Sequence, residues 1–152
     1  LLKESRSDGA RHWCCELFVW YDGGHMALLN ILHAGDEVIA GSGLFGGTID
    51  LFSDLKAFGI TTRFAESVTV EKIEPLINEN TKVVFTELIG NPKLDVVDLK
   101  AVSELVHAHG IPLIIDSTTA TPYLIHPLNM AQMWWFTPLP STSMAAVMPS
   151  AV

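Results

Sequence analysis

The stretch Lys82–Leu88, with the sequence KVVFTEL, is apolar and β-branched, and this composition predicts a buried strand. It is followed by Asp98–His109, DLKAVSELVHAH, whose apolar residues recur at helical spacing behind an aspartate that can cap the helix. Gly110 ends this helix, and Pro112–Ser117, PLIIDS, predicts a second strand that runs into a polar stop. A strand, a helix and a strand in this order are the unit from which parallel sheets are built.

The same alternation precedes this unit. Near-continuous apolar strands separated by helices predict an α/β fold, with a mostly parallel sheet covered by helices on both faces. Ligands of such sheets bind outside the carboxyl ends of the strands, so the polar residues there are the candidate site. The upstream elements are expected at Asp36–Gly41 and Thr61–Ala65 (strands), Thr48–Phe58 (helix, ended by Gly59) and Val70–Asn78 (a helix that Pro75 makes short or bent).

Composition and charge narrow the function classes. The 152 residues are 49% hydrophobic and 17% charged, with a net charge of -8, which fits one ordinary domain and excludes a disordered tail or a basic nucleic-acid binder. No apolar run has the length of a membrane span, and no basic-then-apolar leader opens the sequence. We therefore expect a cytoplasmic globular protein with neither nucleic acid nor membrane as a partner.

A glycine-rich loop, Ser42–Thr48, lies between the first strand and the helix that follows it. It has neither the Walker ending nor the dinucleotide-binding spacing, so it is either a tight turn or an anion site at the helix start. Phe45 within this loop either packs on the core or contacts a ligand.

Two acidic strand ends and a turn are the other candidates. Asp116 ends an apolar strand, where a carboxylate is costly to desolvate unless a cation or strong donor pairs with it; the alternative is a cap for the next turn. Glu87 opens the segment ELIGNP, in which Asn91 offers a donor and an acceptor; the alternative is a plain loop.

The histidines and cysteines predict no metal or redox site. His107 and His109 are two residues apart, so a helix points them in different directions. Cys14 and Cys15 are adjacent and have no further cysteine to join.

Three strings together resemble the Cys/Met-metabolism family of pyridoxal-phosphate enzymes: AGDEVIAGSGLFGGTIDLF, VVFTELIGNPKLDVVDL and GIPLIIDSTTATPYLIHPL. The resemblance spans about residues 28–129. It implies part of the large pyridoxal-phosphate-binding domain of the aspartate-aminotransferase-like fold, with pyridoxal 5'-phosphate as the cofactor.

The resemblance also assigns roles to the candidate residues. It implies that Asp116 pairs with the pyridine nitrogen and that Phe45, where the family usually has tyrosine, stacks on the ring without a hydroxyl. Asn91 would lie near the ring hydroxyl, and Thr118, in the Asp-x-Thr motif, would lie close to the cofactor. Glu87 belongs to the same family string and is included among the cofactor-binding candidates.

Two parts of the family pattern are absent from the sequence as written. They are a Ser-Gly-Met loop that holds the phosphate and a His-Ser-x-Ser/Thr-Lys string whose lysine forms the Schiff base. The last lysine of the sequence is Lys100, so we expect no catalytic lysine at the family position, and whether the chain is an active enzyme stays open.

The two ends differ in composition from the middle. All four tryptophans and both cysteines lie outside Met26–Met130. Read from the third base of each codon, the tail can give D-V-V-V-H-S-T-S-K-Y, and Arg11–His25 read from the second base can give a string containing S-S-S-S-G-M. We expect shifted reading frames in residues 1–25 and 131–152, around a partial cofactor domain at 26–130; the alternative is that both ends are genuine divergent sequence.

The resemblance favours an O-acetylhomoserine sulfhydrylase-like fragment, whose family reaction is γ-replacement on an activated homoserine in methionine and cysteine metabolism. The alternatives are a fragment like cystathionine or methionine γ-lyase and a non-catalytic remnant. A flavodoxin-type nucleotide-binding module fits the strand pattern but not the Asn91-Pro92 and Asp116 strings. The implied partners are a small amino-acid substrate and further copies of the chain, in a homotetramer with sites at a dimer interface.

Overall fold

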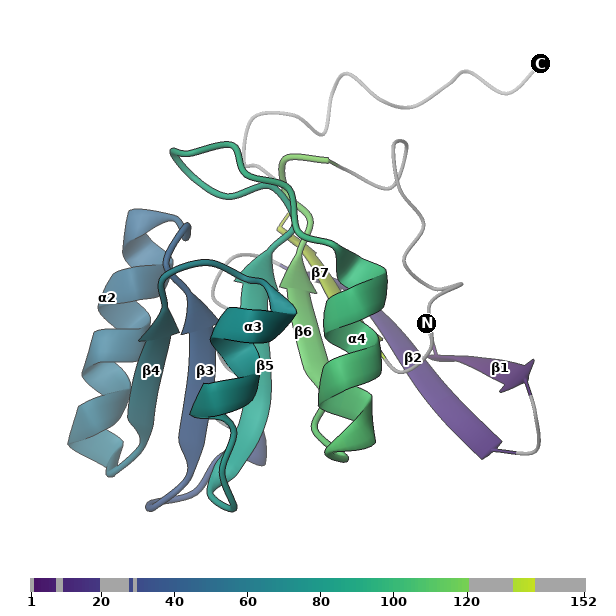
Figure 1. Ribbon diagram of the computed structural model, residues 1–152, viewed down its shortest axis with the longest axis horizontal. Coiled ribbons are helices and arrows are strands. Elements are labelled where there is room, and N and C mark those ends of the chain that lie inside the picture. Colours follow the sequence, from purple (N-terminus) through teal and green to yellow (C-terminus); the bar gives the residue numbers. More distant parts are fainter. Residues whose placement is uncertain (1, 8–9, 20–27, 29, 121–132, 139–152) are drawn as a thin grey trace.

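A computed structural model describes residues 2–7, 10–19, 28, 30–120 and 133–138. One mixed sheet runs through them in the strand order β1-β2-β7-β6-β5-β3-β4 (Figure 1). Strands β1 and β2 are antiparallel, whereas every other neighbouring pair is parallel. The strands are β1 (Leu2–Ser7), β2 (Ala10–Val19), β3 (Glu37–Gly41), β4 (Thr61–Ala65), β5 (Thr81–Glu87), β6 (Leu113–Asp116) and β7 (Met133–Pro138).

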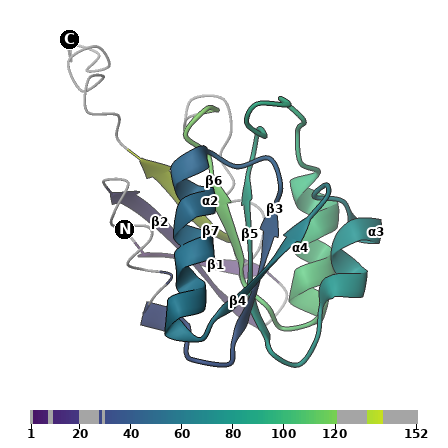
Figure 2. The same cartoon turned by 90° about the vertical axis from the view of Figure 1, so that its left-hand side faces the viewer.

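The helices lie on both faces of the sheet, which confirms the predicted α/β class. Helix α2 covers one face, and α3 and α4 cover the other (Figures 1 and 2). Strands β3, β5 and β6 between these layers are buried over nearly their whole length. The helical elements are α2 (Gly46–Asp54), η1 (Leu55–Phe58), α3 (Val70–Ile73), η2 (Glu74–Leu76) and α4 (Leu99–Ala108).

Two apolar cores fill these layers. The core on the α2 face centres on Phe52, whose ring meets Phe85 edge-on at a centroid distance of 5.1 Å. The core on the other face packs α4 onto β6 through Val102, Val106 and Leu113, all fully buried. Since the middle of the sheet is covered on both sides, its strands carry apolar residues at consecutive positions rather than alternating ones.

Local chain chemistry explains where the elements end. Asp98 caps α4, because its Oδ1 accepts a hydrogen bond from the Ala101 N–H at 3.1 Å, as predicted. Gly59, with φ of 76°, closes the α2–η1 segment in the left-handed region that favours glycine. The predicted helix over 48–58 is therefore present, but it begins at Gly46 and tightens into the 3₁₀ turn η1 in its last four residues.

The second predicted helix, over 70–78, is short as its proline requires. One α-helical turn, α3, is followed by the 3₁₀ turn η2, which holds Pro75 at its start, and the helical segment ends at Leu76.

Three strands lie where the sequence predicted no element. Strands β1 and β2 are in the amino-terminal segment, and β7 is in the carboxyl-terminal one, parallel to β6 with Phe136 opposite Asp116. The sequence of β7, MWWFTP, is rich in aromatic residues, which favour strands whatever the origin of the segment.

Candidate functional site

The candidate residues meet at the carboxyl ends of three neighbouring strands. The glycine-rich loop follows β3, Glu87 is the last residue of β5, and Asp116 is the last residue of β6. In the register of β5 and β6, Glu87 lies directly opposite Asp116. Phe85 and Ile114, two residues earlier on each strand, belong to the core on the α2 face, so strand alternation directs both carboxylates to that side of the edge.

The Glu87 carboxylate is buried and reaches across to the glycine-rich loop. The residue is 7% exposed, and its Oε1 accepts a hydrogen bond from the backbone N–H of Phe45 at 2.5 Å. Burial raises the pKa of Glu87 to about 7; the hydrogen bond from Phe45 opposes this rise, and the nearby charge of Asp116 adds to it. This carboxyl group therefore changes its charge near neutral pH.

Asp116 is equally buried, at 7% exposed, and is held by the residue two places after it. Its Oδ1 accepts hydrogen bonds from the Thr118 N–H at 2.8 Å and from the Thr118 hydroxyl. Burial raises the pKa of Asp116, although both bonds from Thr118 lower it. Asp116 thus does cap the following turn, and its second oxygen has no hydrogen-bond partner among the described residues.

Phe45 presents an aromatic ring at this edge. The residue is 51% exposed and directly precedes α2, where its carbonyl oxygen accepts hydrogen bonds from Thr48 N at 2.9 Å and Ile49 N at 3.1 Å. The sequence left open whether this ring packs on the core, and its exposure shows that it does not.

The loop after β5 touches the glycine-rich loop. The Asn91 N–H donates to the Gly43 carbonyl at 3.2 Å, and a Cβ placed on Gly43 would lie 3.2 Å from the Gly90 Cα. Glycine at position 43 therefore lets the two backbones approach each other. The Asn91–Pro92 peptide bond is cis, and the Asn91 side chain is exposed.

All five predicted residues thus gather at one edge. Glu87 bonds to the backbone of Phe45 and neighbours Asp116, Asp116 bonds to Thr118, and the Asn91 backbone bonds to the loop that carries Phe45. This placement leaves their roles toward a ligand as predictions.

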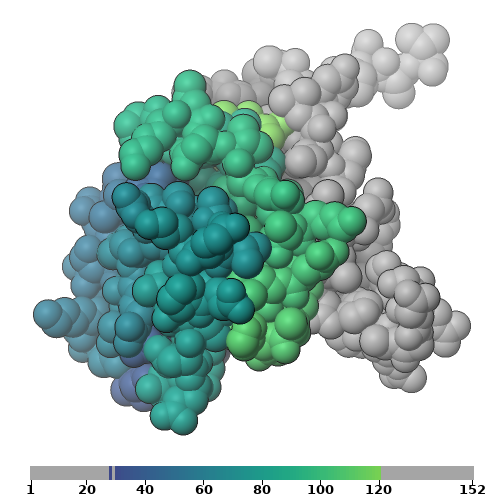
Figure 3. Space-filling view, viewed as in Figure 1, coloured from purple at the N-terminus to yellow at the C-terminus, as the bar shows by residue number. Residues whose placement is uncertain are grey.

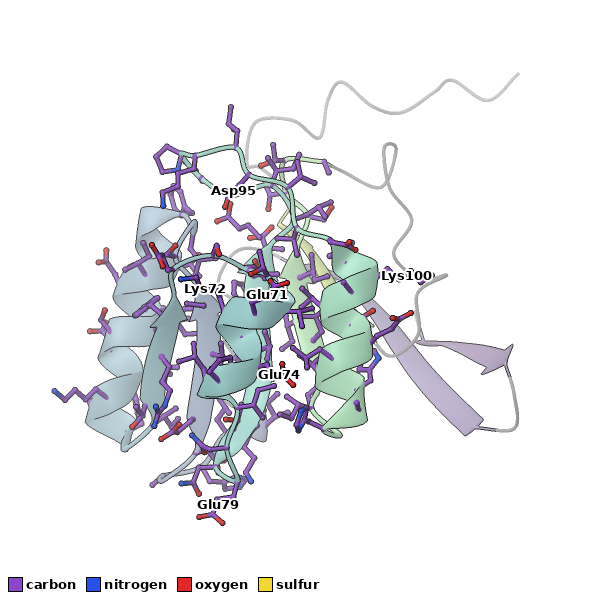
Figure 4. All side chains as sticks on the ribbon, viewed as in Figure 1. Glu71, Lys72, Glu74, Glu79, Asp95 and Lys100 are labelled. Carbon is purple, nitrogen blue, oxygen red and sulfur yellow. The ribbon has the colours of Figure 1, made fainter. Side chains whose placement is uncertain are left out.

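Sequence reasoning missed Asp95 and Ser117. Asp95 points from the loop after β5 back toward the sheet edge, against Gly90 and Gly43 (Figure 4). An aspartate in an exposed, turn-rich loop gives no sequence signal of such a position. The Ser117 hydroxyl is fully buried without a hydrogen-bond partner in the described part of the chain, and the sequence had suggested only a turn cap.

Two hollows differ in their relation to this site. A water-sized hollow of about 10 Å³ lies beside Glu87 and Asp95, lined by the hydroxyl-bearing residues Ser42, Ser67 and Thr86. A hollow of about 450 Å³ lies at the opposite edge, where Lys82 and His109 are among its lining residues, and shares none of the site residues.

Among the described residues, no helix has the length and apolarity to cross a membrane, and no three histidine, cysteine or acidic side chains converge as a metal site.

Comparison with known proteins gives one consistent match. The profile of the family described as Cys/Met metabolism PLP-dependent enzyme matches residues 22–132. The O-acetyl-L-homoserine sulfhydrylase of Leptospira meyeri is 41% identical over 105 residues, which are 68% of this chain and 24% of that protein. The chain thus spans about a quarter of the length of this relative.

Solved structures agree in fold. A structure of O-acetylhomoserine sulfhydrylase from Wolinella succinogenes superposes with a TM-score of 0.61 at 45% identity, over 64% of this chain and 28% of that one. Cystathionine gamma-lyase from Lactobacillus plantarum superposes with a TM-score of 0.70 at 32% identity, over 74% of this chain and 30% of that one. The α/β architecture is therefore that of these enzymes.

Proposed function

Since the chain belongs to the Cys/Met metabolism family of PLP-dependent enzymes, we propose that its carboxyl edge binds pyridoxal 5'-phosphate and that the whole protein acts on a small amino acid. The observation that carries the proposal is the buried carboxylate of Asp116, which has a hydroxyl and an amide on one oxygen and no cation beside it among the described residues. A buried charge of this kind is stable only with a cation or strong donor.

The donor set fits the cofactor. A protonated ring nitrogen of the cofactor would supply the positive partner that the Asp116 carboxylate lacks among the described residues. Thr118 would hold that carboxylate toward the nitrogen. The exposed ring of Phe45 provides a flat apolar surface at the same edge. When bound, pyridoxal phosphate draws electrons away from the reacting carbon of the substrate, and a proton kept on its ring nitrogen strengthens that effect.

We propose γ-replacement on an activated homoserine as the reaction of the whole protein. The identity of 41–45% to sulfhydrylases from Leptospira meyeri and Wolinella succinogenes supports it. A cystathionine- or methionine-cleaving lyase is the second candidate, supported by the higher TM-score with the Lactobacillus plantarum lyase at lower identity. In either case the substrate is an amino acid.

A binding titration tests the site without requiring turnover. The full chain is titrated with pyridoxal phosphate in equilibrium dialysis, and bound cofactor is measured by its absorbance. Asp116→Asn, which removes the charge, is expected to weaken binding at least about tenfold, the equivalent of ~1.4 kcal/mol. Asp98→Asn is the matched control, because Asp98 also accepts a backbone N–H, that of Ala101, but caps the helix α4 and has no bond to Asp116 or Thr118. Equal affinities of the two variants would contradict the proposal.

We propose that the chain holds the cofactor without a covalent bond. The lysines whose contacts the structure gives are engaged elsewhere: Lys72 Nζ pairs with Glu66 at 2.7 Å and Lys82 Nζ donates to the Glu79 carbonyl at 3.0 Å. Borohydride reduction followed by mass spectrometry is expected to leave the chain mass unchanged. A stoichiometric lysine adduct would refute this part of the proposal.

We also propose a homotetramer with sites at a dimer interface for the whole protein. Exposed apolar side chains at the edge support it, namely Phe45, Leu94 and Val96, which a second copy would cover. Light scattering behind size-exclusion chromatography tests it, and a monomer at micromolar concentration would count against it.

We propose, finally, that residues 1–25 and 131–152 are read out of frame around a cofactor domain at 26–130. The support is the codon argument, since the shifted readings restore a Ser-Gly-Met loop and a lysine string, and the proposal implies that the chain as written is a remnant without catalysis. Sequencing the source transcript and genomic DNA tests it. An uninterrupted frame through Trp134-Trp135 in both would overturn it.

A further inference from the structure

The Glu87 side chain does at long range what helix-capping side chains usually do locally. Phe45 is the non-helical residue before α2 and has no capping hydrogen bond from its own side chain. In a capping box, a glutamate three residues into the helix accepts the N–H of the cap residue. Here that position is Thr48, and the carboxylate that accepts the Phe45 N–H comes from the end of β5, 42 residues away.

The glycine-rich loop needs such a tether. Gly43 lies within the loop, and Gly46 and Gly47 form the first turn of α2, so the segment on both sides of Phe45 is rich in the residue that loses most conformational freedom on folding. The loop is held at its start, where Ser42 N donates to the Ala65 carbonyl at 3.0 Å and Asn91 N donates to the Gly43 carbonyl at 3.2 Å. The Glu87 bond acts further along, on the peptide of Phe45 itself.

We propose that Glu87 is a positioning residue: by accepting the backbone N–H of Phe45, it sets where the ring of Phe45 stands at the edge that carries Asp116, and so how tightly a flat aromatic ligand binds at this edge. The ligand half of this inference rests on the proposed function. Glu87 thus acts through Phe45 rather than by touching the cofactor.

The charges around Glu87 make this tether sensitive to protonation. Asp116 faces it from β6, and Asp95, from the loop after β5, lines the small hollow beside it. No lysine or arginine bonds to Glu87 in the described residues, and the Phe45 N–H, which favours the ionised form, does not offset the effect of burial. Because the pKa of Glu87 is raised to about 7, its titration is expected to be visible at the Phe45 amide.

The first test measures whether the charge of Glu87 affects the Phe45 amide. In the 15N-labelled full chain, the Phe45 amide proton shift is followed from pH 5 to 9. It is expected to move with a midpoint near 7 in the parent and to stay flat in Glu87→Gln, which keeps an acceptor oxygen but cannot ionise. A flat curve in the parent, or an unchanged curve in Glu87→Gln, would overturn the tether.

The second test measures how Glu87 affects ligand affinity. Pyridoxal phosphate affinity is measured by equilibrium dialysis for the parent, Glu87→Ala and Glu87→Gln. Loss of the acceptor in Glu87→Ala is expected to weaken binding about tenfold, whereas Glu87→Gln retains affinity to within about threefold. Asp98→Ala is the control, because it removes another carboxylate–amide bond, the one to Ala101 at the start of α4, and is expected to leave affinity unchanged.

The outcomes separate this inference from the proposed function. If the parent does not bind pyridoxal phosphate, the proposed function is wrong, and so is the effect of Glu87 on ligand affinity. The amide titration still shows whether Glu87 holds the Phe45 N–H. A parent that binds, with Glu87→Ala binding equally well, overturns positioning by Glu87 and leaves the proposed function standing. If Glu87→Ala does not fold, Glu87→Gln alone decides. The inference requires glutamine to retain the affinity, so an affinity of Glu87→Gln more than tenfold below that of the parent would overturn it.

Discussion

Replacing Glu87 with glutamine is expected to make the protein more stable at alkaline pH. The glutamate is buried at the sheet edge beside a second acidic residue, Asp116, and its ionised form is therefore poorly solvated. Glutamine has nearly the same shape and retains an oxygen for the Phe45 N–H, but it carries no charge. The substitution removes the cost of ionisation and keeps the contact.

The sign and size follow from the raised pKa. Burial lifts the pKa of Glu87 from the ordinary 4.5 to about 7, so the folded chain binds this proton more tightly than the unfolded chain. The free energy of unfolding of the parent therefore falls as pH rises from about 4.5 through 7, and the loss is complete above about pH 8. Each tenfold in proton affinity is worth ~1.4 kcal/mol, which sets a ceiling of about 3 kcal/mol on the loss. Because the edge admits some water, we expect about 2 kcal/mol.

The assay is urea unfolding followed by circular dichroism at intervals from pH 5 to 9. The quantity compared is the free energy of unfolding of Glu87→Gln minus that of the parent, which should rise by about 2 kcal/mol across this range. Asp98→Asn serves as the control, because it makes the same change of side chain at an exposed residue whose carboxylate bonds to Ala101 and not to Phe45 or Asp116. A Glu87→Gln difference that stays constant, or falls, from pH 5 to 9 would show that Glu87 is not a buried carboxyl group with a raised pKa.

Three further predictions concern the fold around the site. Phe52→Ala should lose about 3 to 5 kcal/mol in urea unfolding, because it empties the core on the α2 face and removes the edge-on contact with Phe85; a loss below 1 kcal/mol would show that this face is not packed. Asp98→Ala should cost about 1 kcal/mol by loss of the α4 cap, with no change of cofactor affinity. Gly90→Ala should destabilise by about 1 to 3 kcal/mol, because its Cβ would run into the Asp95 carboxylate, and Asp95→Gly in the same chain should restore most of that loss.

Much of the fold was predictable because its signals are local. The strand Thr61–Ala65 and the helix behind Asp98 have the predicted bounds to within a residue, since apolar spacing, a capping aspartate and Gly110 lie within a few positions of one another. The order of the strands was not predictable in this way. Strand β4 lies at the edge beyond β3, so β4 and β5, which are consecutive in the chain, are not neighbours in the sheet.

The site was predictable as a set of residues but not as a network. Strand ends in a parallel sheet share one edge, so Glu87 and Asp116 could be placed there from sequence. The hydrogen bond from Phe45 to Glu87 joins residues 42 positions apart, and no periodicity reports such a pair. Its existence depends on β5 and β3 being neighbours in the sheet, which only the structure provides.

The placement of Asp95 shows how the loop after β5 contributes to this edge. In the space-filling view the segment stands above the helices at the carboxyl edge (Figure 3). Its acidic side chain turns back toward Gly43 and Gly90, although its neighbours Leu94 and Val96 expose apolar side chains to solvent. Asp95 itself stays exposed, so its charge remains in contact with water. The neighbouring apolar side chains of Leu94 and Val96 are exposed together, and covering them with another protein surface would be favourable, which is the arrangement that the proposed dimer interface requires.

The two carboxylates at the edge lead to the same conclusion from energetics. Glu87 and Asp116 lie opposite each other, both are buried, and the pKa of each is raised, so this pair lowers the stability of the ligand-free chain at alkaline pH. Each carboxylate makes contacts from one oxygen, Glu87 with the Phe45 N–H and Asp116 with Thr118, and neither is paired with a cation among the described residues. A protonated ring nitrogen bound at Asp116 would offset the negative charge of Asp116 and allow Glu87 to ionise more easily. The destabilising pair is therefore expected to become a stabilising one in the complex, and the stability gained on adding pyridoxal phosphate should be larger above pH 8 than at pH 6.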